Sequence, residues 1–335
     1  MNHEPVKTIL LNGPVARCGL DLTKRYYDSD VDVDVDVDEI TGNESDDERV
    51  RKFAEAEVLV TVNFDSKLPP TPKLRLIHLP ASGMDLIDFS SIPSGCRVCN
   101  AFEHDIGISE YVMSAMLHFT VDLERRSARF KAGDWTDTPQ LFGAFRPELA
   151  GKTLGCVGYG TIGRAVAKRA KAFGMQIMAV TRLPRPFDPE PDWLAGFGLT
   201  EALAEASDFI LVACPLNAET RGLLGKRYIK AMKPSAVLIN VARGPVVDED
   251  VLYEALRSNK IGGAALDTWY HYPTAENQNV KPSKHPFETL DNVIMTPHCS
   301  GWTEGLIARR FAVIIDNIDR LADGRDLVNQ VYPAE

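Results

Sequence analysis

Residues 156–165, CVGYGTIGRA, decide the fold of this 335-residue chain. Gly158, Gly160 and Gly163 have the spacing G-x-G-x-x-G, between an apolar run, KTLGCV, and a helical pattern, TIGRAVAKRAKAFG. A strand before this motif and a helix after it make the motif specific. The first glycine allows a tight turn, and the second lets the backbone approach a pyrophosphate, whose charge the helix N-terminus stabilises. The segment therefore predicts a dinucleotide-binding βαβ unit. The other residues of the turn belong to the same predicted site: Tyr159, Thr161 and Ile162.

The end of the next strand, MQIMAVT, should carry the residue that contacts the adenosine ribose. An acid at this position holds the 2′-hydroxyl of NAD, but this chain has Thr181, followed by Arg182 and Arg185. Without a carboxylate a 2′-phosphate is not repelled, and guanidinium groups can bind it bidentately. We therefore expect NADP as the cofactor. NAD is the alternative if the two arginines are only solvated loop residues.

Strand and helix patterns alternate on both sides of the glycine motif. Regular βαβ alternation predicts a doubly wound parallel sheet of the Rossmann type. The first hundred residues predict a smaller α/β unit, also mostly parallel, with the helix DERVRKFAEAE between two of its strands. The predicted strands are TILLNG, VDVDVDV, VLVTV, LRLIHLP and CRVCN before the motif, and MQIMAVT, DFILVAC, AVLINVA, GGAALDT and NVIMTPH after it.

Two further helical patterns bear on domain organisation. Residues 108–135 show apolar residues at helical spacing over about seven turns, which predicts one long helix that crosses between domains or packs against a second subunit. Residues 302–324 form an amphipathic pattern at the end of the chain. We expect this last helix to return to the first domain, which would make that domain discontinuous.

Charge and hydropathy favour no polyanionic or membrane partner. The net charge is −10, and residues 21–57 contribute 14 acids and 5 bases, a net of −9, so the rest of the chain is nearly neutral. A nucleic-acid backbone would need a basic stripe, and a bilayer span would need about 18–20 apolar residues. The first residues, MNHEPVKTILLNG, do not resemble a signal peptide. We expect a cytoplasmic protein.

Two local patterns carry ordinary structural interpretations. VDVDVDVD, residues 31–38, alternates strictly, as does a strand with one buried and one solvated face. Cys96 and Cys99 form C-x-x-C, but residues three apart on a strand point to opposite faces, and no second pair completes a zinc site. We expect reduced thiols and no bound metal.

Several segments together resemble the D-isomer-specific 2-hydroxyacid dehydrogenases over nearly the whole chain. They are LRLIHLPASGMDLIDFSSI, ISEYVMSAML, ELAGKTLGCVGYGTIGRAVA, CPLNAETRGLL, AVLINVARGPVVDEDVLYEAL, GGAALDTW and MTPHCSGWTE. The resemblance implies a flavodoxin-like substrate domain, residues 1–105 and 298–335, and a Rossmann cofactor domain, residues 106–297. It also implies a homodimer built around the long helix and a small 2-oxo or 2-hydroxy acid as substrate.

The resemblance assigns two catalytic residues. Arg243 in NVARGP corresponds to the substrate arginine, and a guanidinium suits the carboxylate and carbonyl of a 2-oxo acid. His298 in TPHCSG corresponds to the catalytic histidine. Reduction of a carbonyl needs a proton on oxygen, and an imidazole that titrates near neutrality can deliver it.

Further site residues follow from the same resemblance. Ser82 and Gly83 in PASGMD correspond to a loop whose backbone N–H groups hold the substrate carboxylate, which suits an anion without adding a titrating group. Asp267 corresponds to a residue beside the nicotinamide carboxamide. His104 either shapes substrate specificity or is an ordinary loop histidine. The remaining residues expected at the cofactor site are Cys214, Pro215, Thr220, Val241 and Ala242.

The chain departs from the family pattern at Tyr272. Relatives have DVFExEP, whose second glutamate pairs with the histidine and keeps it protonated; here the sequence from Asp267 is DTWYHYP, with Tyr272 at the glutamate position. A phenol can orient an imidazole but cannot raise its pKa as a carboxylate does. Three interpretations follow. His298 works with a lowered pKa, His271 or another group substitutes, or the reaction needs less proton transfer.

We therefore expect an NAD(P)H-dependent oxidoreductase of a glyoxylate- or hydroxypyruvate-type 2-oxo acid. One alternative is formate-type hydride abstraction from another small anion. A second is a dinucleotide-sensing protein that has kept the fold without catalysis.

Overall fold

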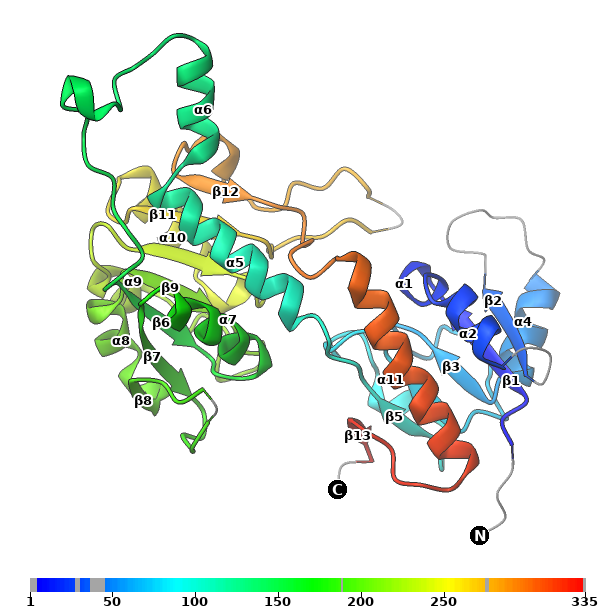
Figure 1. Ribbon diagram of the computed structural model, residues 1–335. Helices are drawn as coiled ribbons and strands as arrows, with labels where there is room; N and C mark the ends of the chain where they lie inside the picture. Colours follow the sequence, from blue (N-terminus) through cyan, green and yellow to red (C-terminus); the bar gives the residue numbers. More distant parts are fainter. Residues whose placement is uncertain (1–4, 28–30, 37–45, 188, 275–276, 334–335) are drawn as a thin grey trace. The chain divides into compact units, whose positions relative to one another are not determined.

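The computed structural model describes residues 5–27, 31–36, 46–187, 189–274 and 277–333. The chain divides into two compact units, Met1–Glu103 with Thr303–Glu335, and His104–Trp302. Each unit has its own sheet of mostly parallel strands with helices against it (Figure 1). The predicted α/β class is therefore confirmed. The predicted ranges, 1–105 with 298–335 and 106–297, differ from the limits of the units by a few residues at each junction.

The unit His104–Trp302 contains a seven-stranded sheet in the order β12-β11-β10-β9-β6-β7-β8, and all neighbouring strands are parallel. The strand order reverses beside β6, the position at which doubly wound sheets bind their ligands. The edge strand β8 was not predicted. The strands are β6 (Thr153–Val157), β7 (Gln176–Thr181), β8 (Trp193–Gly196), β9 (Phe209–Val212), β10 (Val237–Asn240), β11 (Gly263–Leu266) and β12 (Val293–Met295).

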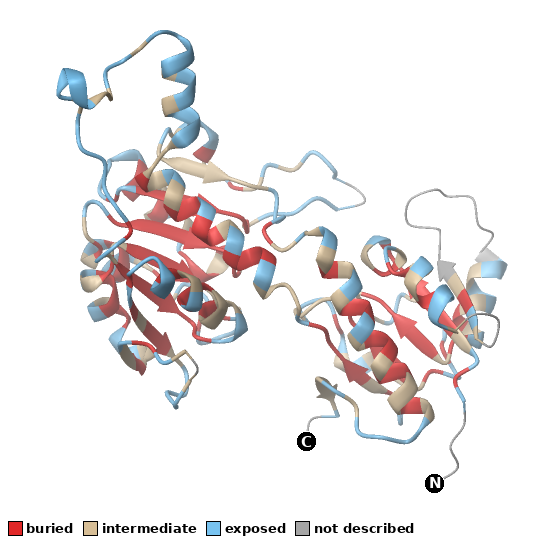
Figure 2. Ribbon diagram, in the orientation of Figure 1, coloured by how far each residue is buried: buried red, intermediate tan, exposed pale blue. Residues whose placement is uncertain are grey.

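Helices cover both faces of this sheet. One core forms beneath α5 (Asp105–Thr120) and α7 (Thr161–Ala172). The other forms beneath α8 (Thr200–Ala206), α9 (Lys226–Ala231) and α10 (Glu249–Arg257). The central strands β6, β9, β10 and β11 are buried along their whole length (Figure 2). This burial explains why their sequences are continuous apolar runs rather than alternating patterns.

The prediction of one long helix over residues 108–135 is wrong. The chain forms α5 and then a separate helix, α6 (Leu123–Lys131). Asp122 between them has left-handed backbone angles, with φ 51°, a conformation that aspartate tolerates better than most residues. Arg126 Nε donates to the carbonyl of Val121 at 2.8 Å, so the interrupted turn keeps a partner. Helix α5 is largely apolar and packs in the core, whereas α6 is polar and amphipathic with no buried residue. Apolar residues recur at helical spacing in both, so this spacing alone does not reveal the break.

The other unit contains a six-stranded sheet in the order β13-β5-β4-β3-β1-β2, in which only the pairing of β13 with β5 is antiparallel. The predicted strand at residues 31–38 appears as β2; residues 37 and 38 lie outside the described residues. The strands are β1 (Thr8–Asn12), β2 (Asp32–Asp36), β3 (Val58–Val60), β4 (Leu76–His78), β5 (Arg97–Cys99) and β13 (Gln330–Tyr332).

The helices of this unit also lie on two faces. Residues of α1 (Pro14–Arg17), α2 (Leu20–Tyr27) and α11 (Glu304–Ala322) pack in one core. Residues of α4 (Asp46–Glu55) pack in the other. The C-terminal helix α11 thus belongs to the same unit as the first hundred residues. No helix in the described part of the chain is long and apolar enough to span a bilayer.

A buried polar network joins β4 to α11. Asn317 Nδ2 lies 2.9 Å from Nε2 of the fully buried His78, whose Nδ1 lies 3.2 Å from the carbonyl oxygen of Leu79. A carbonyl only accepts, so Nδ1 carries the proton and Nε2 accepts from the amide. Asn317 also exchanges two hydrogen bonds with the backbone of Val328, at 2.8 and 2.7 Å. Burial lowers the pKa of His78 to about 4, which keeps the ring neutral.

Cys96 and Cys99 are structural. They are buried in the two cores on opposite faces of their sheet, as expected for residues three apart on a strand. Burial raises the pKa of each thiol to about 12, which makes both unreactive at neutral pH. Within the described ranges, no group of three or more His, Cys, Asp or Glu side chains is placed to hold a metal ion.

Candidate active site

The turn between β6 and α7 contains three glycines. Two of them have no space for a side chain, whereas the third has open space beside it. A Cβ atom at Gly158, where φ is 97°, would lie 2.7 Å from the carbonyl of Ala213. A Cβ atom at Gly163 would lie 2.6 Å from the oxygen of Gly158. At Gly160 a Cβ atom would meet no described atom within 4 Å. The protein itself does not exclude a side chain there, so the open space beside this N-cap glycine is compatible with the close approach of a pyrophosphate.

Thr181 is the last residue of β7, and Arg182 and Arg185 follow on the exposed side of the same edge. The Arg185 guanidinium lies 5.4 Å from the ring centroid of Phe187, within the range of a cation–π contact. The phenol of Tyr159 is buried and donates to the carbonyl of Pro189 at 2.9 Å. The side chain of Tyr159 therefore belongs to the core, and only its backbone contributes to the glycine turn.

The other predicted cofactor residues lie at the carboxyl ends of neighbouring strands. Cys214 and Pro215 follow β9, and Val241 and Ala242 follow β10. Cys214, Val241 and Ala242 are buried, and Thr220 Oγ1 donates to the carbonyl of Pro215 at 2.6 Å. These residues shape the edge of the sheet beside the glycine turn.

Tyr272 and His298 meet directly. The phenol oxygen of Tyr272 lies 3.0 Å from Nδ1 of His298, and the two ring centroids are 5.6 Å apart. The backbone N–H of Trp269 donates to the same phenol oxygen at 3.1 Å. His298 has left-handed backbone angles, with φ 59°, in the loop after β12. The residue at the family's glutamate position is thus the hydrogen-bond partner of the histidine.

This arrangement can hold the imidazole in either protonation state. A phenol has one proton to donate and lone pairs to accept. When His298 is neutral with its proton on Nε2, Tyr272 donates to Nδ1. When the ring is protonated, Nδ1–H donates to the phenol oxygen. Tyr272 can therefore orient the ring throughout a proton transfer while adding no charge.

The charges around His298 favour its neutral form. Partial loss of hydration lowers the pKa of His298, and the nearby guanidinium of Arg243 lowers it further, while the carboxylate of Asp267 opposes the shift. Desolvation raises the pKa of Tyr272 above its ordinary value. At neutral pH the pair is an imidazole and a phenol. The acid form of His298 is therefore populated at a lower pH than that of an unperturbed histidine.

Arg243 begins the short turn after β10. Asn240 Nδ2 donates to its carbonyl at 3.1 Å, and one guanidinium nitrogen donates to the carbonyl of Ala242 at 2.8 Å. A Cβ atom at Gly244 would lie 2.4 Å from the oxygen of Trp269, so the glycine lets this turn approach the segment that carries Tyr272. Arg243 and Gly244 therefore lie against the segment that contains Tyr272.

Asp267 makes structural contacts that the sequence did not reveal. Its fully buried carboxylate accepts from Thr296 Oγ1 at 2.6 Å and from the backbone N–H groups of Cys299 and Ser300 at 2.9 and 3.0 Å. These two N–H groups directly follow His298. The carboxylate therefore fixes the loop that presents the histidine.

Two aromatic residues complete this network. Tyr111 of α5 lies with its hydroxyl 2.8 Å from Thr296 Oγ1, and the Trp269 indole donates to the carbonyl of Thr296 at 2.8 Å. Tyr111, Trp269 and Thr296 were not predicted as site residues. Only the strand-end position of Trp269 and Thr296 could have pointed to them.

Ser82 and Gly83 lie in the unit formed by Met1–Glu103 and Thr303–Glu335, in the loop after β4. Both are partly exposed. Among the described residues, the N–H groups of residues 81–84 have no hydrogen-bond acceptor. His104 is the first residue of the other unit and the N-cap of α5.

Comparison with known proteins shows the family of the domain that carries these residues. The sequence model described as the NAD binding domain of D-isomer specific 2-hydroxyacid dehydrogenase matches residues 113–300. D-3-phosphoglycerate dehydrogenase of Methanocaldococcus jannaschii is 35% identical over 296 residues, which are 85% of this chain but 53% of that protein. Glyoxylate reductase of Thermococcus litoralis is 34% identical over 84% of this chain and 86% of its own.

A solved structure shows the same fold. The D-isomer specific 2-hydroxyacid dehydrogenase family protein from Aeromonas salmonicida superposes with a TM-score of 0.80 at 24% identity, covering 98% of this chain and 99% of that one. The fold and the matched domain thus define an oxidoreductase that uses a nicotinamide nucleotide. The chain belongs to the D-isomer-specific 2-hydroxyacid dehydrogenase family.

Proposed function

We propose that this protein is an NADP(H)-dependent reductase of a small 2-oxo acid, such as glyoxylate or hydroxypyruvate. The hydrogen bond of 3.0 Å between Tyr272 and His298, close to Arg243, carries the proposal. A bound nicotinamide would supply a hydride to the keto carbon. Arg243 and the backbone of Ser82 and Gly83 would bind the carboxylate. The His298 imidazolium would give the Nε2 proton to the carbonyl oxygen and become neutral imidazole.

The preference for NADP rests on the edge of β7. Thr181 cannot repel a 2′-phosphate, and Arg182 and Arg185 are exposed beside it. Guanidinium groups bind phosphate oxygens bidentately. The 2′-phosphate would therefore bind at this edge, while the pyrophosphate would bind over Gly160.

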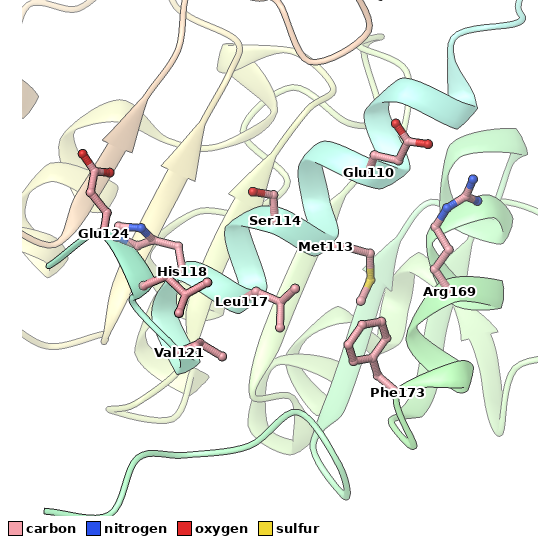
Figure 3. Close-up of a pocket in the computed structure, with 10 residues that line it drawn as sticks. Glu110, Met113, Ser114, Leu117, His118, Val121, Glu124, Arg169 and Phe173 are labelled. Carbon is pink, nitrogen blue, oxygen red and sulfur yellow. The ribbon is translucent and has the colours of Figure 1, made fainter. Parts of the chain in front are cut away.

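A homodimer is the assembly that we propose. Residues 121–148 leave the body of their unit through α6 (Figure 1), and aromatic side chains on this arm, such as Phe142 and Phe145, are almost fully exposed. A hollow at the base of the arm lies between α5 and α7 and is lined by Met113, Leu117 and Phe173 (Figure 3). Apolar surface of this extent suits burial against a second copy.

We also propose a cytoplasmic location, since the cysteines are free thiols, which suits a reducing compartment.

A second candidate is oxidation of another small anion by hydride abstraction, which needs no acid. The neutral Tyr272 beside a histidine of lowered pKa favours it. A panel of 2-oxo acids with NADPH and with NADH, together with small anions and the oxidised cofactors, tests both candidates. Reduction of glyoxylate or hydroxypyruvate supports the first. Turnover of an anion such as formate, without reduction of any 2-oxo acid, supports the second and contradicts the first.

A further inference from the structure

The loop after β4 offers a row of backbone donors. Residues 81–84 connect β4 to the segment that follows, and in the described structure none of their N–H groups has an acceptor. Successive free N–H groups that point to the same side form an anion site. The direction of each N–H group is therefore what decides whether the loop can hold a carboxylate.

Two carbonyl groups of this loop are fixed by the segment after β5. The Ala101 N–H donates to the carbonyl of Ala81 at 3.1 Å. The side-chain amide of Asn100 donates to the carbonyl of Ser82 at 2.9 Å. In a planar trans peptide the C=O and the following N–H point in opposite directions. Because both carbonyls point toward residues 100 and 101, the N–H groups of Ser82 and Gly83 both point away from them.

Asn100 is unusual because its remaining polar atom is left unpaired. The side chain is 3% exposed, and Oδ1 is buried with no hydrogen-bond partner among the described residues. An unpaired buried acceptor lowers stability, and an apolar residue of similar size would avoid that loss. What an apolar residue could not supply is the Nδ2 donor to Ser82. The hydrogen bond to the loop therefore explains why an asparagine occupies position 100, whereas packing alone does not.

We propose that Asn100 is a positioning residue: its amide fixes the Ser82–Gly83 peptide so that the Gly83 N–H binds the carboxylate of the substrate. This inference rests on the proposed function, in which that loop holds the carboxylate. Asn100 does not touch the substrate itself. Its effect passes through the orientation of one peptide group.

The test compares Asn100→Leu with Asn12→Leu in the full-length protein. Asn12 is a matched control because it is 1% exposed, ends β1 of the same sheet, and also has an unpaired Oδ1, but its Nδ2 donates to Thr61 Oγ1 at 3.1 Å. Asn100→Leu should raise the KM for glyoxylate about tenfold and leave kcat within about twofold, because ground state and transition state lose the same contact. The Kd of NADPH should not change.

The outcomes separate positioning from structure. Equal KM values for wild type and a folded Asn100→Leu, or equal increases in both leucine variants, overturn the inference. If Asn100→Leu does not fold, Asn100→Asp keeps the shape and places an oxygen against the Ser82 carbonyl, so its KM must rise.

The inference remains testable if the proposed function fails. If the wild-type protein reduces no 2-oxo acid, the proposed function is wrong. Anion binding by the loop can then be tested by calorimetry, in which oxalate is titrated into the protein already bound to NADP⁺. Weaker oxalate binding by Asn100→Leu than by wild type supports the inference. Equal binding by the two proteins, or no binding by either, overturns it.

Discussion

The phenol oxygen of Tyr272 lies 3.0 Å from Nδ1 of His298, so the histidine of this site has a neutral partner. The contact preserves the orientation that a carboxylate would give but not the charge. A carboxylate partner raises the pKa of an imidazole, whereas here desolvation and Arg243 lower it. The site therefore separates two roles that one glutamate would combine.

Exchange of Tyr272 tests these roles. In the proposed reductase, Tyr272→Phe should lower kcat about tenfold or more, because the ring of His298 loses its partner. The acid form of His298 is needed, so reduction should fall as pH rises through its lowered pKa. Tyr272→Glu should raise that pKa and move the limb of the kcat profile upward by about one to two pH units. Tyr270→Phe is the control, since the Tyr270 hydroxyl bonds Val247. An unshifted profile in Tyr272→Glu would contradict the acid role of His298.

Asp267→Asn should disturb the histidine loop. An amide has one acceptor oxygen, so one of the N–H groups of Cys299 and Ser300 would face an NH₂ group. We expect unfolding free energy to fall by about 2–4 kcal/mol and kcat to fall with it. Thermal or urea unfolding and steady-state kinetics measure both effects. The exposed Asp291→Asn serves as the control. Unchanged stability of Asp267→Asn would show that the three hydrogen bonds are dispensable.

Cofactor choice depends on the edge of β7. Arg182→Ala should weaken NADPH binding about tenfold or more, the loss of a charge-assisted contact, and should leave NADH binding nearly unchanged. Fluorescence titration with both reduced nucleotides measures this difference. Arg227→Ala removes an exposed arginine of α9 that pairs with Glu201 and should change neither affinity. Tighter binding of NADH than of NADPH by the wild-type protein would refute the NADP assignment.

Stability should depend on pH through His78. Its pKa is about 4 in the folded protein and about 6.5 when unfolded. The unfolded state therefore binds the additional proton, and stability present above pH 6.5 is lost as pH falls toward 4. Between pH 6.5 and 5 we expect a loss of roughly 2 kcal/mol from this residue. Urea unfolding at the two pH values should show a smaller loss in His78→Gln. His118→Gln changes an exposed histidine and should keep the full loss of unfolding free energy. Equal losses in the wild type and in His78→Gln would rule out this role of His78.

The exposed arm should be needed for dimerisation. Phe142→Ser combined with Phe145→Ser removes two side chains that are almost fully exposed in one chain. If they are buried in a homodimer, the double variant should shift toward the monomer mass in size-exclusion chromatography with light scattering. Leu199→Ser changes an exposed apolar residue outside the arm and should keep the wild-type mass. A monomeric wild type would remove the basis for this proposal.

Local sequence patterns were enough to predict much of the fold. The spacing of Gly158, Gly160 and Gly163 predicted the turn between β6 and α7, because backbone conformation and close approach are demands made on single residues. Continuous apolar runs predicted the central strands, since burial on both faces excludes polar side chains. The break at Asp122 was not predicted because helical periodicity continues across it. Strand β8 was not predicted either; it lies at the edge of its sheet.

The sequence by itself determined the α/β class and the family, and it placed Tyr272 at the glutamate position. Only the tertiary structure decided what those residues touch. Tyr272 and His298 are 26 positions apart in the chain, and their hydrogen bond depends on how β11 and β12 pair. The same holds for Asp267 beneath the histidine loop and for Asn100 behind Ser82. Such contacts arise where the carboxyl ends of parallel strands meet, and sequence spacing does not encode that meeting.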